Sequence, residues 1–200
     1  MHRCFIALDL DEDVKLALKA SVEPIRRASR AEKPRFVDTS GYHVTLKFLG
    51  DVHAERLDAV RGMLARTLAA SVVLHTHWAG FGGLPRRAKA HVLVGVLRDD
   101  LGELAQLQQV VEQGAVQLDF LPEAREFKPH ATLARFRTSV DLRTFLSLGH
   151  PPPGPVSLSA VTLYESVLTP GGARYTALER FQLRPAEPTE VRDEPALPEG

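Results

Sequence analysis

One four-residue phrase occurs twice in the sequence and limits the folds that the chain can adopt. His-x-Thr-Leu stands at 43–46 in GYHVTLKFLG and again at 130–133 in KPHATLARF. Each copy lies among β-branched and aromatic residues and is predicted to be a strand, in which alternate side chains point to opposite faces. His43 and Thr45 then share one face, as do His130 and Thr132. Two such copies, far apart along the chain, indicate two halves of one site.

The hydrophobic periodicity around the two copies predicts the order β-α-β-β-α-β-β-α-β-β-β. The first predicted helix ends near Arg30, the second runs from about His53 to Ala69, and the third runs from the capping residues Asp99 and Asp100 to about Gly114. The principal predicted strands are 3–10, 43–50, 72–81, 91–97, 130–136, 156–168 and 173–183. Residues 82–87 are predicted to form a loop, 141–148 a short helix, and 150–155 a stiff connector. Recurring hairpin-length connections favour an α+β fold with antiparallel sheets over a doubly wound parallel sheet.

A helix precedes each His-x-Thr strand, so two similar lobes would bring the two copies face to face. We therefore expect residues 1–184 to form a single two-lobed domain. The Pro- and Glu-rich segment 185–200 has little to bury and is predicted to be a disordered tail.

Composition excludes several classes of protein. The 25 Lys and Arg residues balance 25 Asp and Glu residues, so no field of one sign is available to coat a nucleic-acid backbone or an anionic membrane. The lone Cys4 excludes an internal disulfide framework and a cysteine-rich zinc site. No signal peptide and no membrane-spanning apolar run are readable, which predicts a soluble, cytoplasmic protein without a membrane partner.

Two facing histidines can perform phosphoryl chemistry without a metal. One neutral imidazole takes a proton from the attacking hydroxyl or water, and one protonated imidazole gives a proton to the leaving oxygen. The hydroxyls of Thr45 and Thr132 can donate to the non-bridging phosphate oxygens on which charge builds up. From the residues alone, His43 and His130 are interchangeable in these roles. The expected signature is a bell-shaped dependence of rate on pH.

Several cations and aromatic rings are candidates for binding a phosphate or a base. Lys47 has the same strand parity as His43, whereas Arg135 has the opposite parity to His130 and faces the site only if the strand bulges between them. The other candidate cations are Lys128 and the loop residues Arg86, Arg87 and Lys89, and the candidates for base stacking are Phe48, Phe136, Trp78 and Tyr164. The sequence does not choose among these aromatic residues.

Two alternatives compete with acid–base catalysis. In the first, His43 and His130 would be metal ligands, but neither phrase contains the third His, Cys or carboxylate that such sites use. His75 and His77 also share a strand face, and a solvent-facing stripe is favoured there over a metal pair. In the second, the chain would bind nucleotides without chemistry, although a binding module has little need of two proton-transfer groups.

Four segments together resemble the 2H phosphoesterase superfamily. They are RCFIALDL, HVTLKFLG, FKPHATLAR and LYESVL…GGARYTAL, and the resemblance extends from about Arg3 to Leu183. The most similar branch is the RNA 2′,3′-cyclic phosphodiesterases, also called 2′-5′ RNA ligases. The resemblance implies a two-lobed LigT-like fold, with antiparallel sheets lining a central cleft and helices outside.

The same resemblance implies the reaction and the role of each residue. The reaction is hydrolysis of a 2′,3′-cyclic phosphate at an RNA 3′ end to a 2′-phosphomonoester, with no metal required. We also expect a monomer without a cofactor, and reversible 2′-5′ ligation of tRNA halves as a side activity. His43 would donate the proton to the leaving 3′ oxygen, and His130 would accept the proton of water. Thr45 and Thr132 would hold the phosphate, and Arg135 matches a basic residue that follows the second motif.

One strand departs from the family pattern. Relatives often carry an Arg and a Trp in the strand before the third helix, where this chain has Ala90 and Leu93. The paired histidines are unaffected, but that strand lacks these two side chains for contacts with a substrate.

Overall fold

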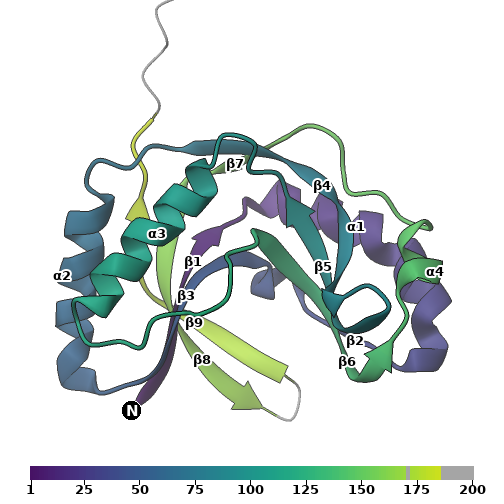
Figure 1. Ribbon diagram of the computed structural model, residues 1–200, viewed down its shortest axis with the longest axis horizontal. Coiled ribbons are helices and arrows are strands. Elements are labelled where there is room, and N and C mark those ends of the chain that lie inside the picture. The colour runs from purple at the N-terminus through teal and green to yellow at the C-terminus, as the bar shows by residue number, and fades with distance from the viewer. Residues whose placement is uncertain (170–171, 186–200) are drawn as a thin grey trace, which may run out of the picture.

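A computed structural model describes residues 1–169 and 172–185 (Figure 1). The helices are α1 (Glu12–Ala28), α2 (Leu57–Leu68), α3 (Glu103–Val116) and α4 (Arg143–Leu146), with short 3-10 helices η1 (Ser29–Glu32), η2 (Thr39–Gly41) and η3 (Ala54–Arg56). The strands are β1 (His2–Asp9), β2 (Arg35–Phe36), β3 (His43–Val52), β4 (Leu74–Arg86), β5 (Lys89–Leu97), β6 (His130–Val140), β7 (Pro155–Leu158), β8 (Ala160–Thr169) and β9 (Gly172–Gln182). Residues 186–200, most of the expected tail, lie outside the described residues.

The strands follow the order β7-β4-β5-β6-β3-β1-β8-β9, with β2 beside β6. Every pairing between these strands is antiparallel, which confirms the predicted α+β class. The contact between β3 and β6 is a single residue pair, Val44 with Ala131. It divides the sheet into one part built on β4, β5, β6 and β7 and another built on β1, β3, β8 and β9.

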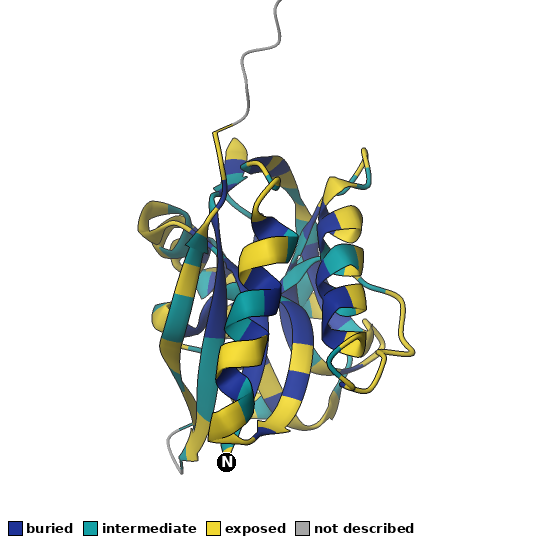
Figure 2. Cartoon of the chain, turned by 90° about the vertical axis from the view of Figure 1, so that its left-hand side faces the viewer, coloured by how far each residue is buried: buried dark blue, intermediate teal, exposed yellow. Residues whose placement is uncertain are grey.

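Helices lie on both sides of the strands. In Figure 1, α2 and α3 stand on one side of the molecule and α1 and α4 on the other. The predicted stripe of α1 is buried at Leu18, Val22 and Ile25, because residues three and four apart share one helix face. Along the helices, buried and exposed residues fall on opposite sides (Figure 2). Burying each such aliphatic side chain contributes about 1.5–3 kcal/mol.

Asp99 caps the start of α3, as predicted. The two carboxylate oxygens of Asp99 accept hydrogen bonds from the backbone N–H groups of Leu104, at 2.9 Å, and Ala105, at 2.8 Å. Asp99 thereby satisfies two donors of the first turn, which have no partner within the helix. Leu101 precedes the helix and is 85% exposed, and Leu104 is the first buried residue of the helix.

Two predicted elements are wrong. Residues 82–86 continue β4 instead of forming a loop, with a shift of register between Leu84 and Pro85. A proline is tolerated in a strand at such an irregularity. The predicted strand 156–168 is two strands, since β7 pairs with β4 whereas β8 pairs with β1. The chain thus passes from one part of the sheet to the other around Ser159, which an apolar pattern cannot reveal.

Within the described residues, no helix combines the length and the apolar character needed to cross a membrane.

Candidate active site

The single pair between β3 and β6 brings the two His-x-Thr phrases together. Val44 and Ala131 are opposite one another and fully buried, so the residues on either side of each point to the other face of the sheet. His43, Thr45, His130 and Thr132 occupy that face, and each is half-buried. The predicted convergence of the two phrases is therefore observed.

The antiparallel direction of β3 and β6 fixes how the histidines lie. With Val44 opposite Ala131, His43 lies on the side of Thr132, and Thr45 lies on the side of His130. The two histidines are then diagonal neighbours, for which backbone separations are on the order of 7–8 Å in a regular sheet. Such a spacing leaves room for a phosphate between the two rings, with one hydroxyl beside each ring.

A β-bulge directs Lys47 away from this face. Ala7 of β1 pairs with Thr45, and the next residue, Ile6, pairs with Lys47, which leaves Leu46 as the extra residue. An extra residue reverses the alternation of a strand. Lys47 is 3% exposed, and its Nζ lies 2.7 Å from Glu112 Oε1 and 2.6 Å from the carbonyl oxygen of Leu121. The prediction that Lys47 binds the phosphate is therefore corrected: its ammonium is held behind the sheet.

The equivalent bulge in β6 directs Arg135 toward the site. Val94 of β5 pairs with Thr132 and Leu93 pairs with Ala134, which leaves Leu133 as the extra residue. Arg135 then lies on the same face as Thr132. The sequence predicted this position for Arg135 only if the strand bulged between His130 and Arg135. Its positive charge contributes to lowering the pKa of both histidines. Arg135 is thus a cation beside the two rings.

Phe48 in β3 is at the position equivalent to Arg135 in β6, because each is the third residue after the threonine of its phrase and follows the bulge of its strand. Its side chain is 61% exposed, and its ring centroid lies 6.1 Å from that of Phe5. The other stacking candidates differ: Phe136 is buried, the hydroxyl of Tyr164 donates to Asp9, and Trp78 lines a separate cavity. Among these four candidates, Phe48 is the one that presents an exposed ring on the face of the histidines.

Aromatic rings enclose His43. Its ring centroid lies 4.8 Å from that of Phe5, 5.2 Å from that of Tyr175 and 6.0 Å from that of Tyr164. Burial disfavours the imidazolium and lowers the pKa of His43 to about 4, although the Asp9 carboxylate and a hydrogen bond with the Gly41 backbone oppose this effect. In the free protein at neutral pH, His43 is therefore a neutral imidazole.

Asp9 connects three side chains beside His43 through hydrogen bonds. Its carboxylate accepts hydrogen bonds from Thr162 Oγ1 at 2.8 Å, the Tyr164 hydroxyl at 2.8 Å and Arg180 Nε at 2.9 Å. Asp9 is also the strand partner of His43. Asp9 lies within the predicted strand 3–10, and no local pattern marked it as a residue of the site. Its partners come from the far end of the chain, so no local signal connects them.

His130 is fixed by its own backbone. Its Nδ1 lies 2.6 Å from the carbonyl oxygen of Lys128, two residues earlier, and the hydrogen bond between His43 and Gly41 also spans two residues. Each imidazole thus has one nitrogen held by the main chain and the other available for proton transfer. Burial is the main cause that lowers the pKa of His130.

The other histidine pair considered from the sequence lies on a different strand. His75 and His77 are exposed on β4, and the Nδ1 of His75 lies 3.1 Å from Ser157 Oγ. Across residues 1–169 and 172–185, no three His, Cys, Asp or Glu side chains are grouped so that they could hold a metal ion. Ala90 and Leu93, the two positions at which the sequence departs from the expected family pattern, are fully buried and offer no polar side chain.

Paired His-x-Thr strands, facing each other across the junction of two antiparallel half-sheets, define a phosphoesterase of the two-histidine type. The chain belongs to the 2′-5′ RNA ligase superfamily, whose model matches residues 14–169. It is 30% identical to the RNA 2′,3′-cyclic phosphodiesterase of Methanothermobacter thermautotrophicus over 90% of this chain and 98% of that protein. The enzyme of the same name from Escherichia coli is 28% identical, over 91% of this chain and 97% of its own length.

Solved structures agree with the family assignment. Escherichia coli LigT in the apo form superimposes with a TM-score of 0.74 at 25% identity, covering 92% of this chain and 98% of LigT. LigT complexed with 3′-AMP superimposes with a TM-score of 0.71 at 27% identity, covering 91% and 98%. The LigT-like fold that the resemblance implied is therefore confirmed.

Proposed function

We propose that this chain is an RNA 2′,3′-cyclic phosphodiesterase that opens the cyclic phosphate at RNA 3′ ends to a 2′-phosphomonoester. The observation that carries this proposal is the Val44–Ala131 pair, because it aligns two imidazoles and two hydroxyls on one face. The curated relatives of this name span almost the whole chain. The complex of LigT with 3′-AMP supports a nucleotide as the kind of ligand.

The proposed reaction is an in-line displacement at phosphorus. His130, neutral, takes a proton from a water molecule as the water oxygen attacks the phosphorus. The bond to the 3′ oxygen breaks, and His43 gives that oxygen its proton, which leaves the phosphate on the 2′ oxygen. The choice of His43 as donor and His130 as acceptor follows the family resemblance.

His43 must acquire its proton before it can donate one. Its pKa of about 4 in the free protein results mainly from burial. A bound phosphodiester adds a negative charge beside the ring, and a nearby anion favours the imidazolium and raises its pKa. Protonation of His43 is therefore coupled to substrate binding, and affinity for the cyclic phosphate should increase as the pH falls from neutral.

Three groups would stabilise the charge on the phosphate. The Thr45 and Thr132 hydroxyls donate to its non-bridging oxygens, and the Arg135 guanidinium compensates the charge that builds up on them. The exposed ring of Phe48 would stack the terminal base. Since each of these groups comes from the protein, we propose that the reaction needs no metal.

The same arrangement accounts for a ligase activity. If the 5′ hydroxyl of a second RNA takes the place of water, the displacement forms a 2′-5′ linkage, and the reverse reaction cleaves it. We include reversible joining of RNA ends, with tRNA halves as the expected substrates, in the proposal. We further propose that the enzyme acts as a monomer in the cytoplasm.

The test is turnover of a nucleoside 2′,3′-cyclic phosphate with and without EDTA. The expected result is equal turnover in both, with the 2′-monophosphate as the product. Loss of turnover with EDTA would contradict the metal-free mechanism, and formation of the 3′-monophosphate would contradict the direction of ring opening. Tight binding without turnover would identify a binding module instead.

A further inference from the structure

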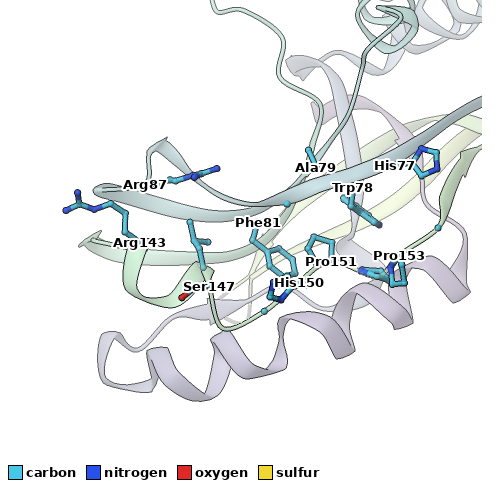
Figure 3. Close-up of a pocket in the computed structure, with 15 residues that line it drawn as sticks. His77, Trp78, Ala79, Phe81, Arg87, Arg143, Ser147, His150, Pro151 and Pro153 are labelled. Carbon is cyan, nitrogen blue, oxygen red and sulfur yellow. The ribbon is translucent and has the colours of Figure 1, made fainter.

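A cavity lies on the face of the sheet opposite the proposed active site. Its volume is about 610 Å³, within the range of roughly 300–1,000 Å³ that is typical of small-molecule sites. Residues of β4, the following turn, α4 and the proline-rich connector line it (Figure 3): His77 to Phe81, Arg87, Arg143, Leu146, Ser147 and Gly149 to Gly154. The residues of the proposed active site are not among them.

The strand register places this cavity away from the two histidines. Phe81 pairs with Gly95, and Gly95 pairs with Ala131. Residues opposite one another in a sheet share a face, and Ala131 points away from the face of His130. The ring of Trp78 also lies behind β5, since a Cβ built on Gly95 would be 3.0 Å from its Cζ3. The sheet therefore separates the cavity from the proposed active site.

The charges around the cavity have one sign. Arg87 and Arg143 line it, and no Asp or Glu does. Arg143 is already paired with Asp141 at 2.6 Å, whereas no ion pair to Arg87 is found among the described residues. Figure 3 shows both arginines at one end of the cavity. That end is suited to an anionic group.

Apart from His77, His150 and Ser147, the rest of the lining is apolar. Trp78, Phe81 and the prolines 151–153 contribute ring surfaces, and Figure 3 shows Phe81, His150 and Pro151 between the arginine end and Trp78. The indole Nε1 of Trp78 is buried, and no hydrogen-bond partner for it is found among the described residues. A buried donor without a partner is unfavourable. A ligand acceptor that reached this nitrogen would provide the missing partner.

We propose that this cavity is a second ligand site for a small anion with a flat aromatic body, of the size of a nucleoside monophosphate. The anionic group binds Arg87, and the aromatic body lies against Phe81, Trp78 and the proline segment. This inference does not depend on the proposed activity.

The experiment uses Trp78, the single tryptophan of the sequence, as its reporter. The full chain is titrated with AMP while indole fluorescence is followed. Adenosine, which lacks the phosphate, and ribose 5-phosphate, which lacks the base, are titrated in parallel. The site predicts a saturable change with AMP and binding at least about tenfold weaker for each fragment, because each loses one half of the contacts.

Matched variants locate the site. Arg87→Gln should weaken AMP binding about tenfold, the effect of losing one charge-assisted hydrogen bond. Arg86→Gln alters the preceding residue, which does not line the cavity, and should leave binding unchanged. Thermal melting establishes that each variant is folded. His130→Ala, which alters the proposed active site on the other face, should retain the fluorescence response.

Three outcomes would overturn the proposal. They are the absence of a fluorescence change with AMP, an equal response in Arg87→Gln, and loss of the response in His130→Ala. The last outcome would show that the signal originates at the proposed active site.

Discussion

Replacing His43 by Gln should change how the stability of the protein depends on pH. The unfolded chain has a histidine pKa near 6.5, and burial lowers the pKa of His43 to about 4 in the folded protein. Between these two values the unfolded state binds more protons, so the free energy of unfolding falls as the pH falls from 6.5 to 4. A difference of this size corresponds to about 3 kcal/mol from His43 alone. Gln cannot take up this proton, so the variant should lack that part of the decrease.

Urea unfolding at a series of pH values between 7 and 4 measures this difference. Other groups titrate in the same range, so the quantity of interest is wild type minus variant, not either curve alone. His53→Gln is the matched control, because His53 is exposed and its replacement should leave the curve unchanged. Parallel curves for wild type and His43→Gln would refute the inference that the aromatic rings keep His43 neutral.

Four further substitutions test the assignment of neighbouring residues. Lys47→Met removes the cation beside the partly buried Glu112 carboxylate and should lower the free energy of unfolding in urea titrations by about 3 kcal/mol. Turnover per folded molecule should be retained. Lost turnover with unchanged stability would restore Lys47 as a phosphate ligand. Arg135→Gln should lower kcat/KM for the cyclic phosphate by about tenfold to a hundredfold without a change in melting temperature, and unchanged kinetics would remove it from the site. Thr45→Val and Thr132→Val keep the side-chain shape and should each lower kcat by about tenfold or more; a wild-type rate in both would mean that neither hydroxyl contacts the phosphate.

The sequence predicted the parts of the fold that depend on local pattern. The stripe of α1, the Asp99 cap of α3 and the strand character of both His-x-Thr phrases are each encoded within a few residues. It did not predict that 156–168 divides into β7 and β8, because both halves are equally apolar and only their partners differ.

The bulges explain why the cations were only partly predictable. Strand parity alone places Lys47 on the face of His43 and Arg135 on the opposite face, and the structure reverses both positions. An extra residue is a property of two paired strands, so neither strand shows it by itself. Asp9 and Tyr175 beside His43 were missed for a related reason, since their contacts join the two ends of the chain.

The central claim is that His43 and His130 act as one acid–base pair. It is tested most directly by turnover of a nucleoside 2′,3′-cyclic phosphate by His43→Ala and His130→Ala, each alone and each verified as folded by circular dichroism. Loss of a general acid or base typically costs about 10²–10⁴-fold in rate, and the account predicts a loss of this size in both variants. Wild-type turnover in either one would contradict it.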